Sequence, residues 1–174
     1  MSYTPAEVSF LMDHHEEITS LDLALTKASR LKDAEVLKEK FGDFGRAVME
    51  LVTARNSGKL PRNWLMDADS AQQATPTGVA AYRMSFLAEQ GVRTVHDLTC
   101  SIGTEGYNCP LDYFGSDLDE SRVRMARYNL SSANIFRADA LTTTTTADVL
   151  LADPARRAGG KTVSYTHLRA HETG

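Results

Sequence analysis

The chain has 174 residues, of which 42% are hydrophobic and 24% charged, and its formal net charge is −4. This composition is typical of a globular protein, and the negative charge excludes a general attraction to nucleic acid or anionic lipid. No apolar run approaches the roughly 20 residues that a membrane helix needs, and the N-terminus lacks the pattern of a signal peptide. We therefore expect a cytoplasmic protein without membrane contact; the sequence leaves its oligomeric state open.

Residues 1–90 show helical patterns only. The stretch TPAE at 4–7 forms a capping box with proline at the first helical position. Ser20 predicts the start of a second helix, and the pair Thr75–Pro76 predicts the start of another helix, which Gly91 ends. The expected inward residues are Leu21, Leu25, Ala28 and Leu31 in the helix from Ser20, and Val79, Tyr82, Phe86 and Leu87 in the later one. We predict a helical region over residues 1–90.

After Gly91 the pattern changes to short apolar segments that alternate with one helix. Strands are predicted over 92–98, 112–118, 134–139 and 147–153, and Asp119 caps the helix after the second strand. The fourth segment is apolar through its middle, as a strand buried on both faces should be. This alternation indicates βαβ units and a parallel sheet.

Each of the four predicted strands has an aspartate at its carboxyl end or one residue before it. These are Asp97, Asp117, Asp139 and Asp153. Because ligands of such sheets bind beyond the carboxyl ends of the strands, the four side chains are candidates for one site. Gly103, in the loop after the first strand, would let the backbone approach a ligand closely.

Each candidate also has a purely structural interpretation. A single aspartate often caps a turn or helix, and Cys100 is expected to be a small apolar filler rather than a nucleophile. His96 and Trp64 are expected to pack in the core. Two cysteines are too few for a disulfide framework or a zinc site, which agrees with a reducing compartment and predicts no metal.

The motifs taken together resemble a known family. The segments DLTCSIGTEG (97–106), GSDLDESRVRMARYNL (115–130), ADAL (138–141) and DVLLADPARR (148–157) resemble, in order, the motifs of class I S-adenosylmethionine-dependent methyltransferases. The nearest match is the bacterial branch whose complete members end in a THUMP-like domain, which is itself similar to the RNA cap guanine-N2 methyltransferases. The resemblance covers about residues 72–161. It implies an α/β fold in which the N-terminal helical region precedes a truncated Rossmann-like parallel sheet.

The resemblance implies S-adenosylmethionine as the cofactor. The cofactor-binding residues that it implies are Asp97, Thr99, Cys100, Ser101, Gly103, Asp117, Leu118, Asp139 and Ala140. Within this set the loop from Asp97 would pass the methionine part, Asp117 would hold the ribose hydroxyls, and Leu118 would contact the adenine. Asp139 and Ala140 would meet the adenine edge.

The fourth motif would form the methyl-transfer site, with Asp153 and Pro154 as its catalytic residues. It reads DPAR and lacks the aromatic residue that would stack on a flipped base, which puts a base nitrogen as acceptor in doubt. Arg156 and Arg157 would contact a phosphate of the substrate, or form a solvated loop pair. The segment 103–117 is short and contains a proline, so that the helix after the first strand is expected to be short or broken.

The last residues do not follow the preceding pattern. Back-translated, 163–173 resembles a sequencing-library adapter read in frame, and we expect 162–174 to be a non-native tail. Residues 91–161 would then be the first half of a methyltransferase domain. On this interpretation the chain is a fragment and inactive by itself.

The predicted function is a methyltransferase that acts on RNA. The alternative is a non-catalytic RNA-binding or adaptor protein that retains the methyltransferase fold, which the DPAR motif favours. A nicotinamide-dependent oxidoreductase is disfavoured, because the G-x-G-x-x-G fingerprint is absent.

Overall fold

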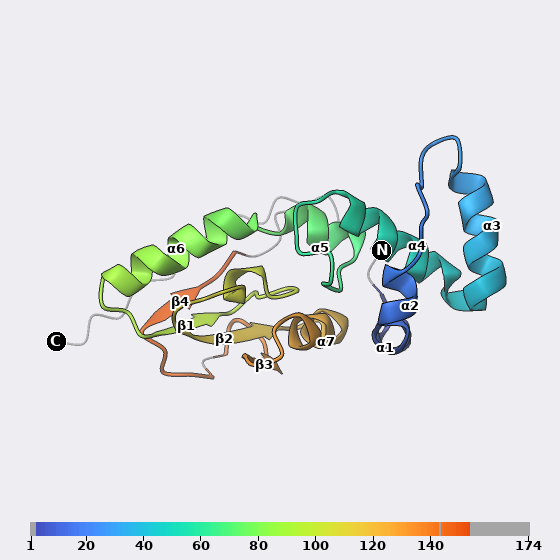
Figure 1. Ribbon diagram of the computed structural model, residues 1–174. Coiled ribbons are helices and arrows are strands. Elements are labelled where there is room, and N and C mark those ends of the chain that lie inside the picture. Colours follow the sequence, from blue (N-terminus) through green and yellow to red (C-terminus); the bar gives the residue numbers. More distant parts are fainter. Residues whose placement is uncertain (1–2, 143, 154–174) are drawn as a thin grey trace, which may run out of the picture.

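The computed structural model describes residues 3–142 and 144–153 (Figure 1). Helices come first along the chain and strands follow them. In chain order the elements are α1 (Pro5–Asp13), α2 (His15–Thr19), α3 (Arg30–Phe41), the 3-10 turn η1 (Gly42–Phe44), α4 (Gly45–Asn56), α5 (Ala68–Gln73), α6 (Thr77–Glu89), β1 (Thr94–Asp97), the 3-10 turn η2 (Thr104–Gly106), β2 (Asp112–Asp117), α7 (Glu120–Asn129), β3 (Asn134–Arg137) and β4 (Val149–Leu151).

The four strands form one parallel sheet in the order β3-β2-β1-β4. This is the order in which a doubly wound sheet begins, with a switch point between β1 and β4. In the register, Asp97 at the end of β1 lies opposite Gly115 of β2 and Leu151 of β4. The predicted fold class, helices followed by a Rossmann-like parallel sheet, is confirmed.

The connection between β1 and β2 is short and contains no α-helix. Residues 98–111, all of them described, contain η2 but no α-helix, as the short segment with its proline predicted. Instead α6, which precedes the sheet in sequence, packs against η2 and runs alongside the strands (Figure 1). A helix from the N-terminal part of the chain therefore covers the loop that follows β1.

The capping box of α1 is present as predicted. Thr4 Oγ1 accepts a hydrogen bond from Glu7 N at 3.2 Å, and Glu7 Oε2 accepts one from Thr4 N at 2.8 Å. This reciprocal pair satisfies two backbone donors that the first helical turn leaves unpaired. The sequence therefore specified this helix start by itself.

The helix predicted from Ser20 is wrong. Ser20 ends α2, and α3 begins only after Ser29. The reason lies in local polar contacts: Asp33 Oδ2 accepts hydrogen bonds from Leu25 N at 3.1 Å and from Ser29 Oγ at 2.7 Å. Leu25 has a φ of 45°, and Leu31 is 77% exposed rather than inward.

The expected inward face of α6 is also largely wrong, although Gly91 ends the helix as predicted with a φ of 84°. Val79, Tyr82 and Phe86 are at least half exposed. The neighbouring face, which includes Ala80 and Met84, is buried instead. Both faces carry apolar residues at helical spacing, and the smaller Ala80 allows the closer approach to the rest of the molecule.

The strand β4 departs from the expectation in one respect. Among the described residues it pairs with β1 only, and its central Leu150 is 53% exposed. The prediction of a strand buried on both faces is therefore wrong for the described chain. The central β1 does fit such a description, since Val95 and His96 are fully buried.

The helices and the sheet share one hydrophobic core. It includes Leu11 and Leu51 from the first helices, Met84 from α6, Ile102 from the loop after β1 and Met125 from α7, all fully buried. Trp64 contacts Tyr107 edge to face, with ring centroids 5.5 Å apart. The division into a helical region over 1–90 and a sheet domain over 91–161 stays a prediction.

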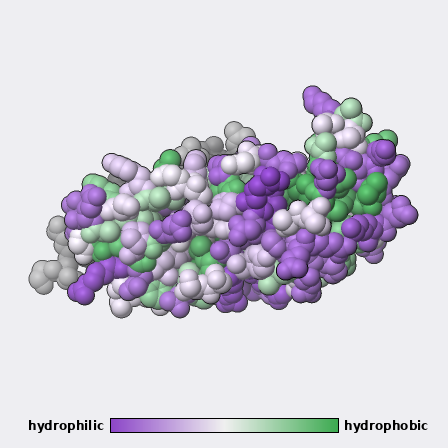
Figure 2. Space-filling model, in the orientation of Figure 1, coloured by the Kyte–Doolittle hydropathy of each residue, from purple (hydrophilic) through white to green (hydrophobic). Residues whose placement is uncertain are grey.

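One face of the molecule carries mainly polar residues (Figure 2). Figure 2 shows a largely hydrophilic face with an apolar patch at the end of the molecule where α3 lies. Within the described ranges, no helix has the length and apolar character required to cross a membrane.

Candidate functional site

A cavity of about 580 Å³ lies beyond the carboxyl ends of the strands. It is lined by residues from the ends of all four strands, from α6 and from the loop after β1. Nine of the residues predicted from sequence line it: Asp97, Thr99, Cys100, Ser101, Asp117, Leu118, Asp139, Ala140 and Asp153. The four strand-end aspartates therefore share one hollow, as parallel strands require.

The loop after β1 is tied to the strands on both sides of it. On the β2 side, Cys100 N donates to Ser116 O at 2.9 Å, and Ser101 N donates to Asp117 Oδ2 at 3.0 Å. On the β4 side, Thr99 Oγ1 accepts a hydrogen bond from Asp153 N at 2.9 Å. These contacts fix the cavity wall before any ligand binds.

Asp97 is the most perturbed acid of the site. Its Oδ2 accepts a hydrogen bond from Tyr113 Oη at 3.0 Å, and its Oδ1 accepts one from Thr99 N at 3.2 Å. Burial raises the pKa of Asp97 to about 7 and outweighs these two hydrogen bonds, while the nearby carboxylates of Glu105 and Asp117 raise it further. A positive charge brought into the cavity would therefore lower the pKa of Asp97 and favour its carboxylate form.

Asp117 is placed to accept further hydrogen bonds. Besides the bond from Ser101, its Oδ1 accepts one from Asp119 N at 3.0 Å. Each carboxylate oxygen has a second lone pair, so that a pair of adjacent hydroxyls could still be bound. Asp119 itself caps α7, as predicted, by accepting a hydrogen bond from Arg122 N at 3.0 Å.

The far end of the cavity combines polar and apolar groups. Asp139, in the turn after β3, accepts a hydrogen bond from Leu141 N at 2.9 Å through Oδ1. Ala140 follows it, and Leu118 after β2 is 61% exposed. An exposed leucine beside a carboxylate suits a flat heterocycle with a hydrogen-bonding edge.

Cys100 and His96, which the sequence predicts to be packing residues, are both buried. Cys100 is 3% exposed, and burial raises the pKa of its thiol well above the usual range, so that it is neutral. His96 is fully buried: its Nε2 lies 2.8 Å from Ser116 Oγ and its Nδ1 lies 2.8 Å from Thr145 Oγ1. Neither geometry prepares a nucleophile or base.

Gly103 does not line the cavity. It has a φ of 93°, and a Cβ atom placed on it would lie 2.6 Å from Leu130 Cδ1. The structure therefore uses this glycine for a left-handed turn under the end of α7. Its predicted role in cofactor binding stays a prediction.

Three charged residues of the cavity were missed by the sequence analysis, namely Arg83, Glu105 and Arg122. Arg83 of α6 forms an ion pair with Glu105 of η2, and both line the cavity. Glu105 belongs to the glycine loop, which was a usable signal. Arg83 gave none, because only the packing of α6 on η2 turns its side chain toward the strand ends.

Three predicted residues, Pro154, Arg156 and Arg157, lie outside the described residues, as does the tail over 162–174. Within the described ranges, no cluster of three or more His, Cys, Asp or Glu side chains could hold a metal ion.

The described lining is strongly acidic. Its carboxylates come from Asp97, Glu105, Asp117, Asp139 and Asp153, and its guanidinium groups from Arg83 and Arg122. Five acidic side chains against two basic ones favour a ligand that carries positive charge. The remaining lone pair on each carboxylate oxygen of Asp117 favours a ligand with hydroxyl groups.

Comparison with known proteins gives two relatives and no matching family model. Both relatives are named as uncharacterized S-adenosylmethionine-dependent methyltransferases of Mycobacterium tuberculosis, one from strain CDC 1551 / Oshkosh and one from strain ATCC 25618 / H37Rv. Each is 38% identical over 155 residues, which is 79% of this chain but 42% of the relative. The chain thus spans less than half the length of two proteins named as S-adenosylmethionine-dependent methyltransferases, and over most of its own length it is similar to them.

Proposed function

We propose that this chain is the cofactor-binding part of a class I S-adenosylmethionine-dependent methyltransferase. The observation that carries the proposal is the convergence of Asp97, Asp117, Asp139 and Asp153 on one cavity at the carboxyl ends of four parallel strands. The names of the two relatives support it independently.

In this proposal the cofactor lies across the carboxyl ends of β3, β2 and β1. Asp139 with Ala140 would receive the adenine edge at β3, Asp117 the ribose hydroxyls at β2, and the loop from Asp97 the amino acid end at β1. When bound, S-adenosylmethionine supplies a methyl group on a positively charged sulfur, and the acidic lining complements that charge. The protein itself orients the donor and excludes water from it.

The acceptor would enter at the end of β4. Asp153 and Pro154 would meet the acceptor atom there, and Arg156 and Arg157 would contact a phosphate of the substrate. RNA is the substrate class that we propose, by resemblance of the motifs. We further propose that the protein acts in the cytoplasm and that this chain, which spans 42% of its relatives, does not complete the reaction alone.

Binding calorimetry tests the proposal directly. We expect S-adenosylmethionine and S-adenosylhomocysteine to bind, and a reduced nicotinamide dinucleotide not to bind. Asp117→Ala should weaken S-adenosylmethionine binding by about 10- to 100-fold, because hydrogen bonds to a carboxylate are lost.

Asp148→Ala is the matched control. Asp148 also accepts hydrogen bonds from two backbone N–H groups, of Arg93 and Thr94, but it does not line the cavity. Equal losses in both variants, or no binding by the wild-type chain, would contradict the proposal. Labelled-methyl transfer to RNA, measured with one of the longer relatives beside this chain, separates an enzyme from the adaptor alternative, which binds the cofactor without turnover.

A further inference from the structure

Glu105 has one carboxylate oxygen that the described protein does not use. The residue is 8% exposed, and its Oε1 accepts a hydrogen bond from Arg83 Nη1. Its Oε2 is buried and accepts no hydrogen bond from any described residue. An ionised oxygen in this state lacks the donors that water would give it, and a ligand that carries N–H groups would supply them.

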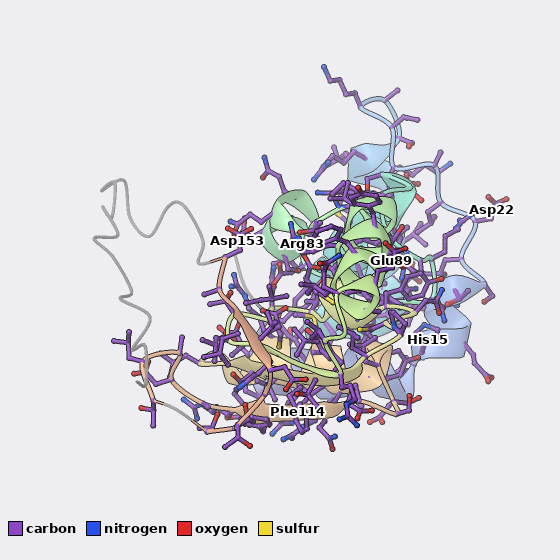
Figure 3. The ribbon with its side chains drawn as sticks, turned by 90° about the vertical axis from the view of Figure 1, so that its left-hand side faces the viewer. His15, Asp22, Arg83, Glu89, Phe114 and Asp153 are labelled. Carbon is purple, nitrogen blue, oxygen red and sulfur yellow. The ribbon has the colours of Figure 1, made fainter. Side chains whose placement is uncertain are left out.

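Arg83 has donors left for an anion. Only Nη1 is engaged with Glu105, and the side chain is 41% exposed, so that further N–H groups of its fork have no partner among the described residues. Figure 3 shows Arg83 on α6 on the same side of the molecule as Asp153, and both line the cavity. A guanidinium in this position suits a planar carboxylate.

The pair lies at the end of the cavity near β1. Glu105 belongs to η2, which lies in the loop that follows β1, and both Glu105 and Asp97 at the end of β1 line the cavity. The adenine and ribose positions proposed above lie at the ends of β3 and β2. The remaining end of the cofactor, its amino acid group, would therefore face η2 and α6.

We propose that Arg83 and Glu105 bind the amino acid end of S-adenosylmethionine, with Arg83 holding the α-carboxylate and Glu105 accepting from the α-ammonium group. This inference rests on the proposed function and adds to it a subsite built by side chains outside the strand-end motifs. It makes α6, a helix from before the sheet, part of the cofactor site.

Binding calorimetry with three ligands distinguishes the contribution of Arg83 to affinity from that of Glu105. S-adenosylmethionine has both charged groups, decarboxylated S-adenosylmethionine lacks the carboxylate, and methylthioadenosine lacks both. Arg83→Gln should weaken the first by about tenfold or more and leave the other two almost unchanged. Glu105→Gln should weaken the first two and leave methylthioadenosine almost unchanged.

Matched controls come from the ion pair between Arg124 and Glu120, 2.7 Å apart. The exposed fraction of the Arg124 side chain, 40%, is similar to the 41% of Arg83. Neither Arg124 nor Glu120 lines the cavity. Arg124→Gln and Glu120→Gln should leave all three affinities unchanged. Thermal melts of every variant establish that it folds, and Arg83→Lys, which keeps the charge, should restore part of the lost affinity.

The outcomes decide between the two proposals. Equal weakening of all three ligands by the site variants, or unchanged binding of S-adenosylmethionine, overturns the subsite and leaves the proposed function intact. Failure of the wild-type chain to bind any of the three overturns both. The wild-type chain alone also gives a check that needs no variant: it should bind methylthioadenosine about tenfold or more weakly than S-adenosylmethionine.

Discussion

At the scale of single residues, Asp97 shows how burial sets chemistry. The side chain is 5% exposed, and its two hydrogen bonds do not offset the loss of water around the carboxylate. Its pKa of about 7 is therefore far above the ordinary value of 3.8. The strand that places Asp97 at the cavity also keeps it close to half-ionised at neutral pH.

The raised pKa predicts a particular pH dependence of stability. Because the folded state holds the Asp97 proton up to about pH 7 and the unfolded state loses it near pH 4, the free energy of unfolding should fall as pH rises through this window. Above about pH 7 the contribution should not change further. Asp97→Asn should remove this decline, measured as urea unfolding at several values from about pH 5 to about pH 8.

His96 titrates in the same range with the opposite sign. Burial lowers its pKa below 6.5, so that its contribution to stability rises with pH up to the unfolded value. Since His96 is present in both proteins, the difference between wild type and Asp97→Asn isolates the aspartate. A difference that stays constant over the whole range would show that Asp97 is not buried as described.

At the scale of elements, the end of α7 joins three parts of the chain. Asn129 Nδ2 donates to Leu65 O at 2.9 Å and to Ile102 O at 3.1 Å, and its Oδ1 accepts from Leu65 N at 2.7 Å. Leu65 belongs to the connector between α4 and α5, and Ile102 to the loop after β1. One amide side chain thus links the N-terminal helices to the cavity wall.

Replacing this amide should affect both stability and binding. Asn129→Ala removes three hydrogen bonds and leaves partly buried backbone groups unpaired, which should cost about 2–4 kcal/mol in chemical denaturation. We also expect weaker binding of S-adenosylhomocysteine, because the loop at 98–106 loses a support. Asn56→Ala is the control: Asn56 likewise ends a helix but is exposed, and the change should cost less than about 0.5 kcal/mol. Equal costs at both positions would contradict a linking role for Asn129.

Local signals explain which elements could be predicted. The capping box at Thr4, the cap at Asp119 and the helix end at Gly91 depend on nearby atoms and were read correctly from sequence. The start of α3 was missed, because Asp33 stabilises a turn that competes with the helix pattern. The face of α6 was missed, because two faces had similar periodicity and only tertiary packing distinguishes them.

The candidate site divides in the same way. Strand-end aspartates follow from the sheet topology, so that their convergence could be predicted before the structure was known. Arg83 could not, since nothing near it in sequence indicates that α6 lies over η2. The close packing of Gly103 was equally hidden, because it depends on Leu130 at the end of α7.

At the scale of the whole molecule, the helices and the sheet behave as one packed unit. The hydrophobic core is continuous from α1 to β3, and the contact between Trp64 and Tyr107 crosses from the helical part to the loop after β1. A shared core of this kind couples the unfolding of the parts on either side.

The chain should therefore unfold in a single transition. Trp64 is the only tryptophan, so that its fluorescence reports the junction, while far-ultraviolet circular dichroism reports all helices. We expect the two signals to give the same midpoint in urea. An early fluorescence change followed by a separate loss of helix would instead favour two domains that unfold independently, as the division near residue 90 predicts.

The absence of an α-helix from 98–111 has a bearing on how the molecule is made. Because α6 covers the loop after β1, the covering helix is synthesised before the backbone that it covers. During synthesis on the ribosome, Ala80 and Met84 of α6 would stay without their packing contacts to the loop after β1 until η2 has emerged. The subsite proposed for Arg83 and Glu105 would accordingly form only after η2 has emerged, while the ends of β2, β3 and β4, which complete the cavity, follow later in the chain.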